Sequence, residues 1–459
     1  MPHARIRAGA AREGRPYRDP LRDKWIFHAK CQRENLVQLK GVKFVQATLV
    51  VVLVLLVTMS LVHSPGTGDV DTWKRWAHNA DALGIASGFK ANHGDYPPYT
   101  SVILLGAVRI SRLLGIGAFG AVKFSVFLFL LLTSLVFWWW TRDFWITVIL
   151  HLSLLLNSVA LGYVDIFFVP SLILSIWAIK EKRLILFTIF YSIACLTKWQ
   201  PIIIAPFIGV YILDIKHVRH WKQIDFKRLI GHVLIPAVAI VIPALSVFGV
   251  VAVLASLKYA ATHDFLSGNA LNFNWILTHW LRVFYPERFG GLIQGQAKYI
   301  RTRSLEITFF PHLLFFLSYI SVMASFLRRD KTFEAMINFS LTGYLAYFIF
   351  NTGVHENHLF LAAILSVILF WVNRDRLFVM VFLLLMSNIN LFVFYGITGS
   401  GLGFSRAIAN TVDVALLLSI FNVSFFLVLW GMNVFRSKTN HAAHPCVQPT
   451  LLRSTSQRR

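Results

Sequence analysis

Two carboxylates follow the first long apolar run of the chain, in the segment 68–76 with the sequence GDVDTWKRW. Asp69 and Asp71 stand out because the chain carries 21 Asp and Glu residues against 44 Lys and Arg residues. A carboxylate beside a membrane costs free energy to keep there and is rarely explained by packing. These two acids are therefore the first candidates for chemistry.

The helical pattern predicts different roles for the two acids. Apolar residues recur at helical spacing from Trp73 onward, so Asp71 is well placed to cap a helix that begins there. Asp69 then has no capping role and is free to face a cavity. We therefore expect Asp69, rather than Asp71, to act as a general base.

Three further short segments carry polar residues beside apolar runs. In Asp95-Tyr96-Pro97-Pro98 the prolines suit a first helical turn, and Asp95 is either its cap or a substrate ligand. Asp165, at the end of a short turn that starts at Gly162, has the same two interpretations. In the segment 198–201, KWQP, Lys198 either reaches the lipid headgroups or binds a lipid phosphate. Tyr96 and Gln200 are further candidate substrate ligands.

The segment 354–358, VHENH, concentrates two histidines and an acid. Its spacing is not that of a zincin helix, so a divalent metal is compatible with His355 and His358 but is not indicated. The alternative is a phosphate site, formed with Glu356, in which a protonated histidine donates to an anion. No nucleotide or dinucleotide fingerprint occurs in the chain, and we expect no cofactor.

Asn272 and Asn274 alternate with aromatic residues in the segment 269–275, NALNFNW. Amide side chains beside aromatic rings suit sugar binding, and they equally suit plain turns. We retain both residues as candidate substrate ligands.

Composition identifies the class of protein that must position these residues. The chain has 459 residues, of which 56% are hydrophobic and 14% are charged, and apolar runs of membrane length recur along it. These features predict an all-α, polytopic membrane protein. The net charge of +23 is explained by basic loops that face anionic lipid, so nucleic acid is not an expected partner.

About twelve membrane spans follow from the apolar runs. A basic cytoplasmic tail is expected at 1–42, a transmembrane domain at 43–435 and a second cytoplasmic tail at 436–459. The two long outer loops are 63–117 and 258–306. The expected spans are 44–62, 118–140, 144–161, 164–179, 184–197, 200–215, 229–257, 307–327, 334–351, 358–373, 377–395 and 411–433.

The first outer loop contains two stretches with helical apolar periodicity, near 73–84 and 99–115. We expect both to be amphipathic helices lying in the membrane interface. The alternative is that 99–115 is a short span. With interfacial helices, most basic loops fall on the inner side, and the candidate residues above all fall on the outer side.

Four of these segments, in this order, resemble motifs of the GT-C glycosyltransferase superfamily. Gly68-Asp69-x-Asp71 resembles the Gly-Asp-x-Glu loop of the glucosyltransferases that extend dolichol-linked oligosaccharide in the endoplasmic reticulum. Asp95-Tyr96-Pro97-Pro98, Lys198-x-Gln200 and Val354-His355-Glu356 are similar to later motifs of the same enzymes. Asn357 stands where that family has lysine, and the segment 162–165 is more similar to bacterial relatives.

The resemblance implies an inverting hexosyltransferase, for glucose or mannose, that uses a polyprenyl-phosphate sugar. The acceptor would be a glycan, a lipid-linked sugar or a protein, on the outer side of a membrane, with the bacterial inner membrane favoured over the endoplasmic reticulum. The base would be Asp69 and the donor phosphate would lie near His355 and Lys198. The alternative function is a transporter or a flippase of lipid-linked sugars, although such proteins usually place ionisable sites near the membrane midplane.

Overall fold

The computed structural model describes residues 45–215 and 226–435. Both expected tails, 1–42 and 436–459, lie outside the described residues. The chain divides into two units, residues 1–59 and residues 60–459, and the fold below is that of the second unit. In the first unit the described residues belong to the apolar helix Val45–Val62.

Seven helices in the described part of the chain are long and apolar enough to cross a membrane. The protein is therefore helical and membrane-embedded, as expected. Five more apolar helices have 10–17 residues, so the count of about twelve spans stays a prediction. The seven are Val45–Val62, Ala118–Thr141 (α5), Ile230–Phe248, Leu305–Leu327 (α15), Phe333–Phe350 (α16), Arg374–Tyr395 and Val414–Phe435 (α19).

The first outer loop forms three helices instead of the expected two: α2 (Asp69–Leu83), α3 (Ile85–Asn92) and α4 (Pro98–Leu113). Gly84, with φ of +80°, ends the first one and separates it from α3. α4 buries Thr100, Leu104 and Ala107 on one face and exposes Ile110 on another. It is not among the apolar helices of spanning length, so the interpretation of 99–115 as amphipathic is favoured over a span.

Two predicted spans, 144–161 and 164–179, are irregular where they meet. α6 (Phe144–Leu155) continues as a π-helix, η1 (Leu156–Ala160). A turn then leads into a 3-10 helix, η2 (Val164–Phe168), and α7 (Val169–Lys180). Such helical irregularities are frequent at functional sites.

The span expected at 229–257 ends earlier than predicted, at Phe248, because the chain breaks at Gly249, which has a φ of +85°. The segment consists of α10 (Phe226–Leu229), η5 (Ile230–Leu234) and α11 (Ile235–Phe248), followed by a separate α12 (Val250–Ala261). Glycine adopts this positive φ without steric cost, which allows α12 to take a new direction.

The remaining elements complete the bundle. They are α8 (Leu184–Thr197), η3 (Gln200–Ile204), α9 (Ala205–Ile212), α13 (Phe273–Phe284), α14 (Pro286–Phe289), η6 (Glu356–His358), α17 (Leu359–Val372), η7 (Arg374–Arg376), α18 (Leu377–Tyr395), and the antiparallel strands β1 (Ala407–Ile408) and β2 (Val412–Asp413).

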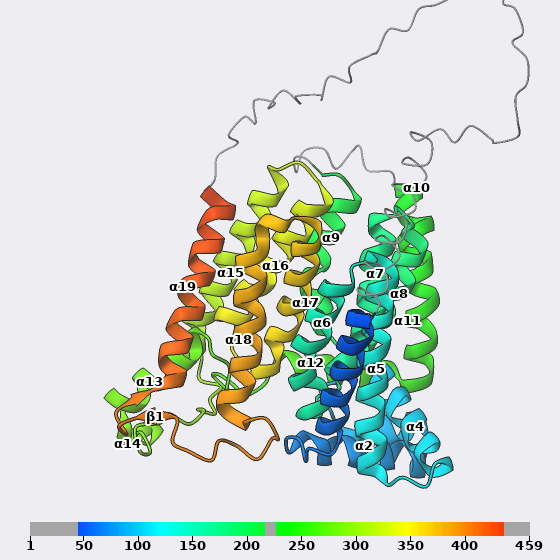
Figure 1. The fold of residues 1–459 in the computed structure, drawn as a ribbon. Helices are drawn as coiled ribbons and strands as arrows, with labels where there is room; N and C mark the ends of the chain where they lie inside the picture. The colour runs from blue at the N-terminus through cyan, green and yellow to red at the C-terminus, as the bar shows by residue number, and fades with distance from the viewer. Residues whose placement is uncertain (1–44, 216–225, 436–459) are drawn as a thin grey trace, which may run out of the picture. The chain divides into compact units, whose positions relative to one another are not determined.

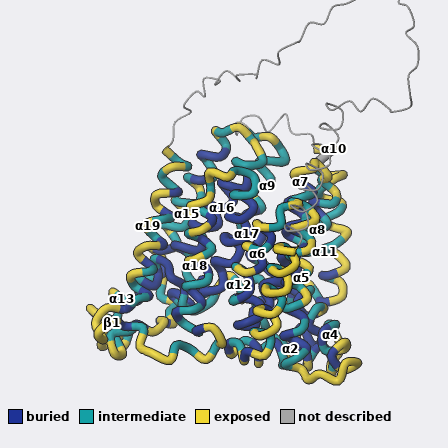
Figure 2. Tube along the Cα trace, viewed as in Figure 1, coloured by how far each residue is buried: buried dark blue, intermediate teal, exposed yellow. Residues whose placement is uncertain are grey.

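The most deeply buried helices are α16 and α17, which Figure 2 shows as largely dark segments. Every residue from Leu359 to Leu369 is buried, which is expected of a helix that is apolar on all sides and packed among others. These two helices flank the segment 351–358, so the histidine cluster is supported by the most deeply buried helices of the core.

One end of the bundle carries α2, α4, α13 and the short β1–β2 hairpin (Figure 1). A buried ion pair fixes the hairpin: Arg406 Nε lies 2.8 Å from Asp413 Oδ1, and Asp413 is fully buried. Asp413 Oδ2 also accepts a hydrogen bond from the backbone N–H of Ala297, which ties the hairpin to the long loop.

Arg406→Met should destabilise the protein by about 3–5 kcal/mol, because it leaves the buried Asp413 carboxylate without its cation. The control is Arg374→Met, which removes an exposed arginine from its pair with Asp143 and should cost about 1 kcal/mol or less. The measurement is the thermal unfolding midpoint in detergent. Equal midpoints for the two variants would contradict the role given to Arg406.

Candidate functional site

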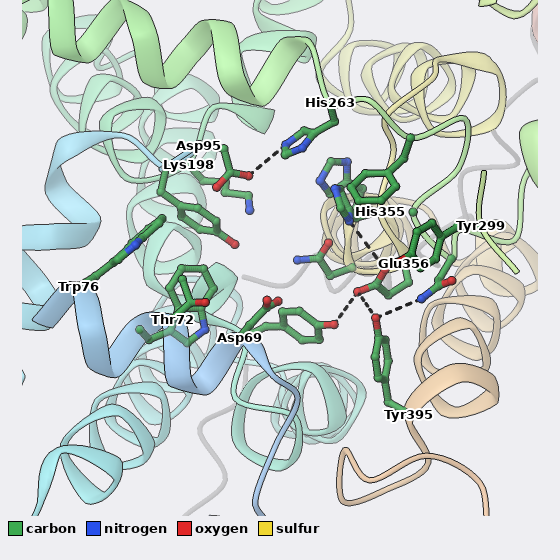
Figure 3. A pocket seen from close by; sticks show the side chains of 18 residues that line it. Asp69, Thr72, Trp76, Asp95, Lys198, His263, Tyr299, His355, Glu356 and Tyr395 are labelled. Carbon is green, nitrogen blue, oxygen red and sulfur yellow. Dashed lines mark hydrogen bonds and ion pairs between the residues drawn. The ribbon is translucent and has the colours of Figure 1, made fainter. Parts of the chain in front are cut away.

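A cavity of about 360 Å³ opens among α2, the turn before α4, the long loop and the start of η6. Figure 3 shows that side chains from all of these segments surround a common space. Seven of the predicted residues line it: Asp69, Asp95, Tyr96, Lys198, His355, Glu356 and His358. The structure thus brings together motifs that are almost 300 residues apart in the sequence.

Asp69 is the first residue of α2, with Gly68 as the N-cap, and its side chain faces the cavity (Figure 3). Among the described residues it has no side-chain hydrogen bond or ion pair. Burial raises its pKa to about 6, with a further contribution from the nearby Asp95 charge, and Lys198 only partly opposes this. An unpaired carboxylate that titrates near neutral pH can accept a proton from a bound hydroxyl.

Asp71 does not belong to the cavity, and the prediction that it caps α2 is wrong. It lies inside the first turn, is largely exposed and pairs with Lys74 at 2.8 Å. That contact lowers its pKa. The N-cap is Gly68, three residues before the predicted cap, and this shift turns Asp71 towards the solvent.

One wall of the cavity is aromatic. Trp73, Trp76 and Tyr96 pack edge to face, with ring centroids 5.0–5.9 Å apart. Gly94 permits this arrangement, because a Cβ at that position would lie 2.2 Å from the Trp76 ring. Aromatic faces of this kind bind the apolar faces of sugar rings as well as other flat or apolar groups.

Lys198 stands between this wall and a buried acid. Its Nζ lies 3.6 Å from the centre of the Tyr96 ring and 2.7 Å from Asp165 Oδ1. Asp165 does not line the cavity. It is fully buried behind it and also accepts hydrogen bonds from the Tyr96 hydroxyl and from the Asn357 amide. Asp165 is therefore a positioning residue, while Lys198 itself reaches the cavity.

Asp95 does not cap α4, contrary to one of its two interpretations, because the N-cap is Pro97 and no side chain contributes to it. Instead Asp95 Oδ2 lies 3.2 Å from His263 Nε2. Burial raises the pKa of Asp95, but the hydrogen bond from His263 and the charge of Lys198 outweigh it and lower the pKa to about 2. Asp95 therefore stays ionised at neutral pH.

His355 is held by backbone pairing between the long loop and the segment that precedes η6. Gly353 donates to Phe265, Gly268 donates to Val354, and Glu356 donates to Gly268. Gly268 must lack a side chain, because a Cβ there would lie 2.6 Å from His355 Nδ1. This pairing fixes the loop across the cavity.

The His355 ring lies 4.8 Å from the ring of His263, centre to centre. Burial and the proximity of His263 lower the pKa of His355 to about 4. In the free site His355 is therefore neutral at pH 7, which differs from the protonated donor expected from the sequence. A neutral imidazole still donates one N–H group, and an anion bound nearby favours its protonation.

Glu356 faces the cavity with one of its oxygens held in place. Its Oε1 accepts hydrogen bonds from Tyr163 at 2.5 Å and from Tyr395 at 3.1 Å. Its Oε2 lies 4.0 Å from His355 Nδ1. His358 is turned in part towards the core, where its Nδ1 contacts the Tyr347 hydroxyl.

Three predicted ligands lie elsewhere. Asn272 caps α13 through the backbone N–H of Trp275 and donates to the Phe348 carbonyl, and Asn274 donates to two carbonyls after α16. Gln200 begins η3 and is buried away from the cavity. The asparagines thus have the structural role that the sequence left open.

Sequence reasoning missed several residues of the cavity. His263, Phe265, Asn269 and Tyr299 come from the long loop 258–306, Tyr163 comes from the turn between η1 and η2, and Tyr395 is the last residue of α18. His263 follows α12, whose separation from α11 was not predicted. The sequence does indicate His263 as a candidate, because it is a polar residue just after an apolar run. The candidates that were identified share this feature.

Among the described residues no group of three His, Cys, Asp or Glu side chains is arranged to hold a metal ion. No protein-family model matches the chain, and a search of curated proteins found no significant match.

Asp69→Asn should stabilise the protein at pH 8 and leave its stability unchanged near pH 4. Below pH 4 the carboxyl is protonated in both the folded and the unfolded chain. Between about pH 4 and 6 the unfolded chain has lost this proton while the folded protein still holds it, so the loss of stability builds up over that range and is complete above about 6; the amide avoids it. The shift corresponds to at most about 3 kcal/mol.

The measurement is the thermal unfolding midpoint in detergent at both pH values. The exposed Asp71→Asn serves as the control and should bring no gain at pH 8, because the pKa of Asp71 is shifted in the opposite direction. Destabilisation of Asp69→Asn at pH 8 would show that the carboxylate has a partner.

Proposed function

We propose that the protein is an inverting membrane glycosyltransferase of the GT-C type. It would transfer a hexose from a polyprenyl-phosphate sugar to a glycan, lipid-linked or protein acceptor on the outer side of the membrane. The observation that carries this proposal is the unpaired, partly buried Asp69, which lies across the cavity from His263 and His355 (Figure 3). A base and a set of donors for a leaving phosphate thus share one cavity.

In the proposed reaction the acceptor hydroxyl attacks the anomeric carbon of the donor sugar and passes its proton to Asp69. The bond between that carbon and the phosphate oxygen breaks at the same time, and polyprenyl phosphate leaves with the bonding electrons. Attack from the side opposite the phosphate inverts the configuration. A base whose pKa is about 6 is well matched to work near neutral pH.

The leaving phosphate would be bound by His355, His263 and Lys198. The charge of Lys198 is partly balanced by Asp165, and the ionised Asp95 accompanies His263. A site with this charge balance suits the single phosphate of a polyprenyl-phosphate sugar better than a pyrophosphate. In a partly dry cavity, donors held in advance stabilise developing charge more effectively than they would in water.

Glu356 is suited to the sugar rather than to the phosphate. Because two tyrosine hydroxyls hold its Oε1, the other oxygen is oriented to accept hydrogen bonds from ligand hydroxyls. Burial raises the pKa of Glu356 to about 7, so near neutral pH its side chain can donate a hydrogen bond to a sugar hydroxyl as well as accept one. The aromatic wall of Trp73, Trp76 and Tyr96 would face the sugar rings.

Asp69→Asn should reduce transfer by about 10²-fold or more, because it removes the base and retains the shape of the side chain. Asp71→Asn should keep transfer within about twofold of the unchanged protein. The measurement is release of polyprenyl phosphate by purified protein from a panel of polyprenyl-phosphate sugars, together with donor binding. Full activity of Asp69→Asn would exclude Asp69 as the base.

The pH dependence should show the same group. Asp69 must be deprotonated to accept a proton, so kcat/KM should fall about tenfold for each pH unit below about 6 and reach a plateau above about 7. The limb should persist in Glu356→Gln, a control that is needed because the carboxyl of Glu356, in the same cavity, has a pKa of about 7. A profile without this acidic limb would contradict the assignment. Movement of labelled lipid-linked sugar across vesicles without release of polyprenyl phosphate would instead support a transporter.

A further inference from the structure

A lysine is buried within α5, away from the cavity. Lys123 has no exposed surface, and its Nζ donates hydrogen bonds to the carbonyls of Val159 at 2.6 Å and Ala160 at 2.9 Å. Its amine does not reach the solvent, so it is not a lysine that extends to the lipid headgroups. A cation at this position is costly and calls for a specific role.

The two carbonyls belong to the end of the π-helix η1. The chain cannot continue the helix there, because it turns at Gly162 with a φ of +78°. Backbone N–H groups of Leu161, Gly162 and Tyr163 bond to the earlier carbonyls of residues 156–158. The carbonyls of Val159 and Ala160 receive Lys123 instead, and a cation also suits the negative end of a helix.

The turn that follows contacts the start of the helix that carries Asp69. The Leu161 carbonyl accepts a hydrogen bond from the backbone N–H of Thr67 at 3.0 Å. The contact at Gly162 is so close that a Cβ there would lie 2.5 Å from Val70 Cγ2. The position of residues 67–70, and with them Asp69, therefore depends on this turn.

The turn and the start of η2 that follows it carry two side chains that hold the rest of the cavity. Tyr163 donates to Glu356, and Asp165 binds Lys198, Tyr96 and Asn357. The turn thus lies between the base on one side and the ligands of the sugar and phosphate on the other.

We propose that Lys123 is a positioning residue for the reaction: by fixing the end of η1, it sets the place of the turn 161–163 and of the start of η2, and through them the place of Asp69 relative to Glu356 and Lys198. This role rests on the proposed function as far as catalysis is concerned. The anchoring of the turn itself does not.

The test compares Lys123→Met, which keeps the length of the side chain and removes its donors, with Thr133→Val. Thr133 is equally buried in α5, and its hydroxyl bonds only to the carbonyl of Phe129 in the same helix. In Lys123→Met the backbone amides of residues 161–163 should exchange hydrogen at least about tenfold faster, as measured by mass spectrometry. In Thr133→Val their exchange should be unchanged.

Activity gives the second readout. Lys123→Met should lower kcat for transfer about 10–100-fold, because small displacements of reacting groups have effects of that size. It should also move the acidic limb of the pH profile away from about 6, since the environment of Asp69 changes. Lys123→Gln retains amide donors and should recover part of both effects. If Lys123 had a merely structural role, the acidic limb would stay near pH 6 in both variants, and Lys123→Gln would have no shift to reverse.

The outcomes separate the two proposals. Faster exchange at 161–163 in Lys123→Met would support the anchoring. If the unchanged protein at the same time showed no transferase activity, the proposed function would be contradicted. Normal exchange and an unshifted pH profile in an active Lys123→Met protein would overturn the role of Lys123. If Lys123→Met does not fold, the same two measurements on Lys123→Gln decide, and exchange equal to that of the unchanged protein with full activity would overturn it.

Discussion

The buried carboxylate of Asp165 joins three segments that are far apart in the sequence. Its Oδ1 binds Lys198 and Tyr96, and its Oδ2 accepts a hydrogen bond from Asn357. A buried ion pair is stable only when hydrogen bonds satisfy the remaining lone pairs, and here they do. Because Tyr96 belongs to the aromatic wall and Asn357 follows Glu356, the geometry of the cavity depends on this one group.

The irregular helices around the cavity follow from the same requirement. A polar carboxylate can be held inside an apolar bundle only where backbone and side-chain donors converge on it. The π-helix η1, the 3-10 helix η2 and the turn at Gly162 bring Asp165 and Tyr163 inward within a few residues. A regular helix across 156–168 would distribute these side chains around its circumference instead.

Much of the cavity could be predicted because polar residues are conspicuous in so apolar a chain. Asp69, His355 and Lys198 were found in this way. What could not be predicted was decided by tertiary contacts or by small shifts of register. The start of α2 at Asp69 turned Asp71 outward, and Gly249 divided a long apolar run whose composition alone indicates one helix. His263 lies at the cavity through the pairing of Gly268 with the segment at Val354, which no local pattern encodes.

The unpaired state of Asp69 has a consequence for the lifetime of the protein in a cell. A partly buried carboxylate without a partner lowers the stability of the folded protein, whereas a ligand hydroxyl that donates to it restores part of the loss. Anything that binds only the folded protein reduces the fraction open to proteases. If the protein has the proposed function, proteases would therefore degrade it faster in a membrane that lacks the acceptor. Its abundance would then follow the supply of its own substrate.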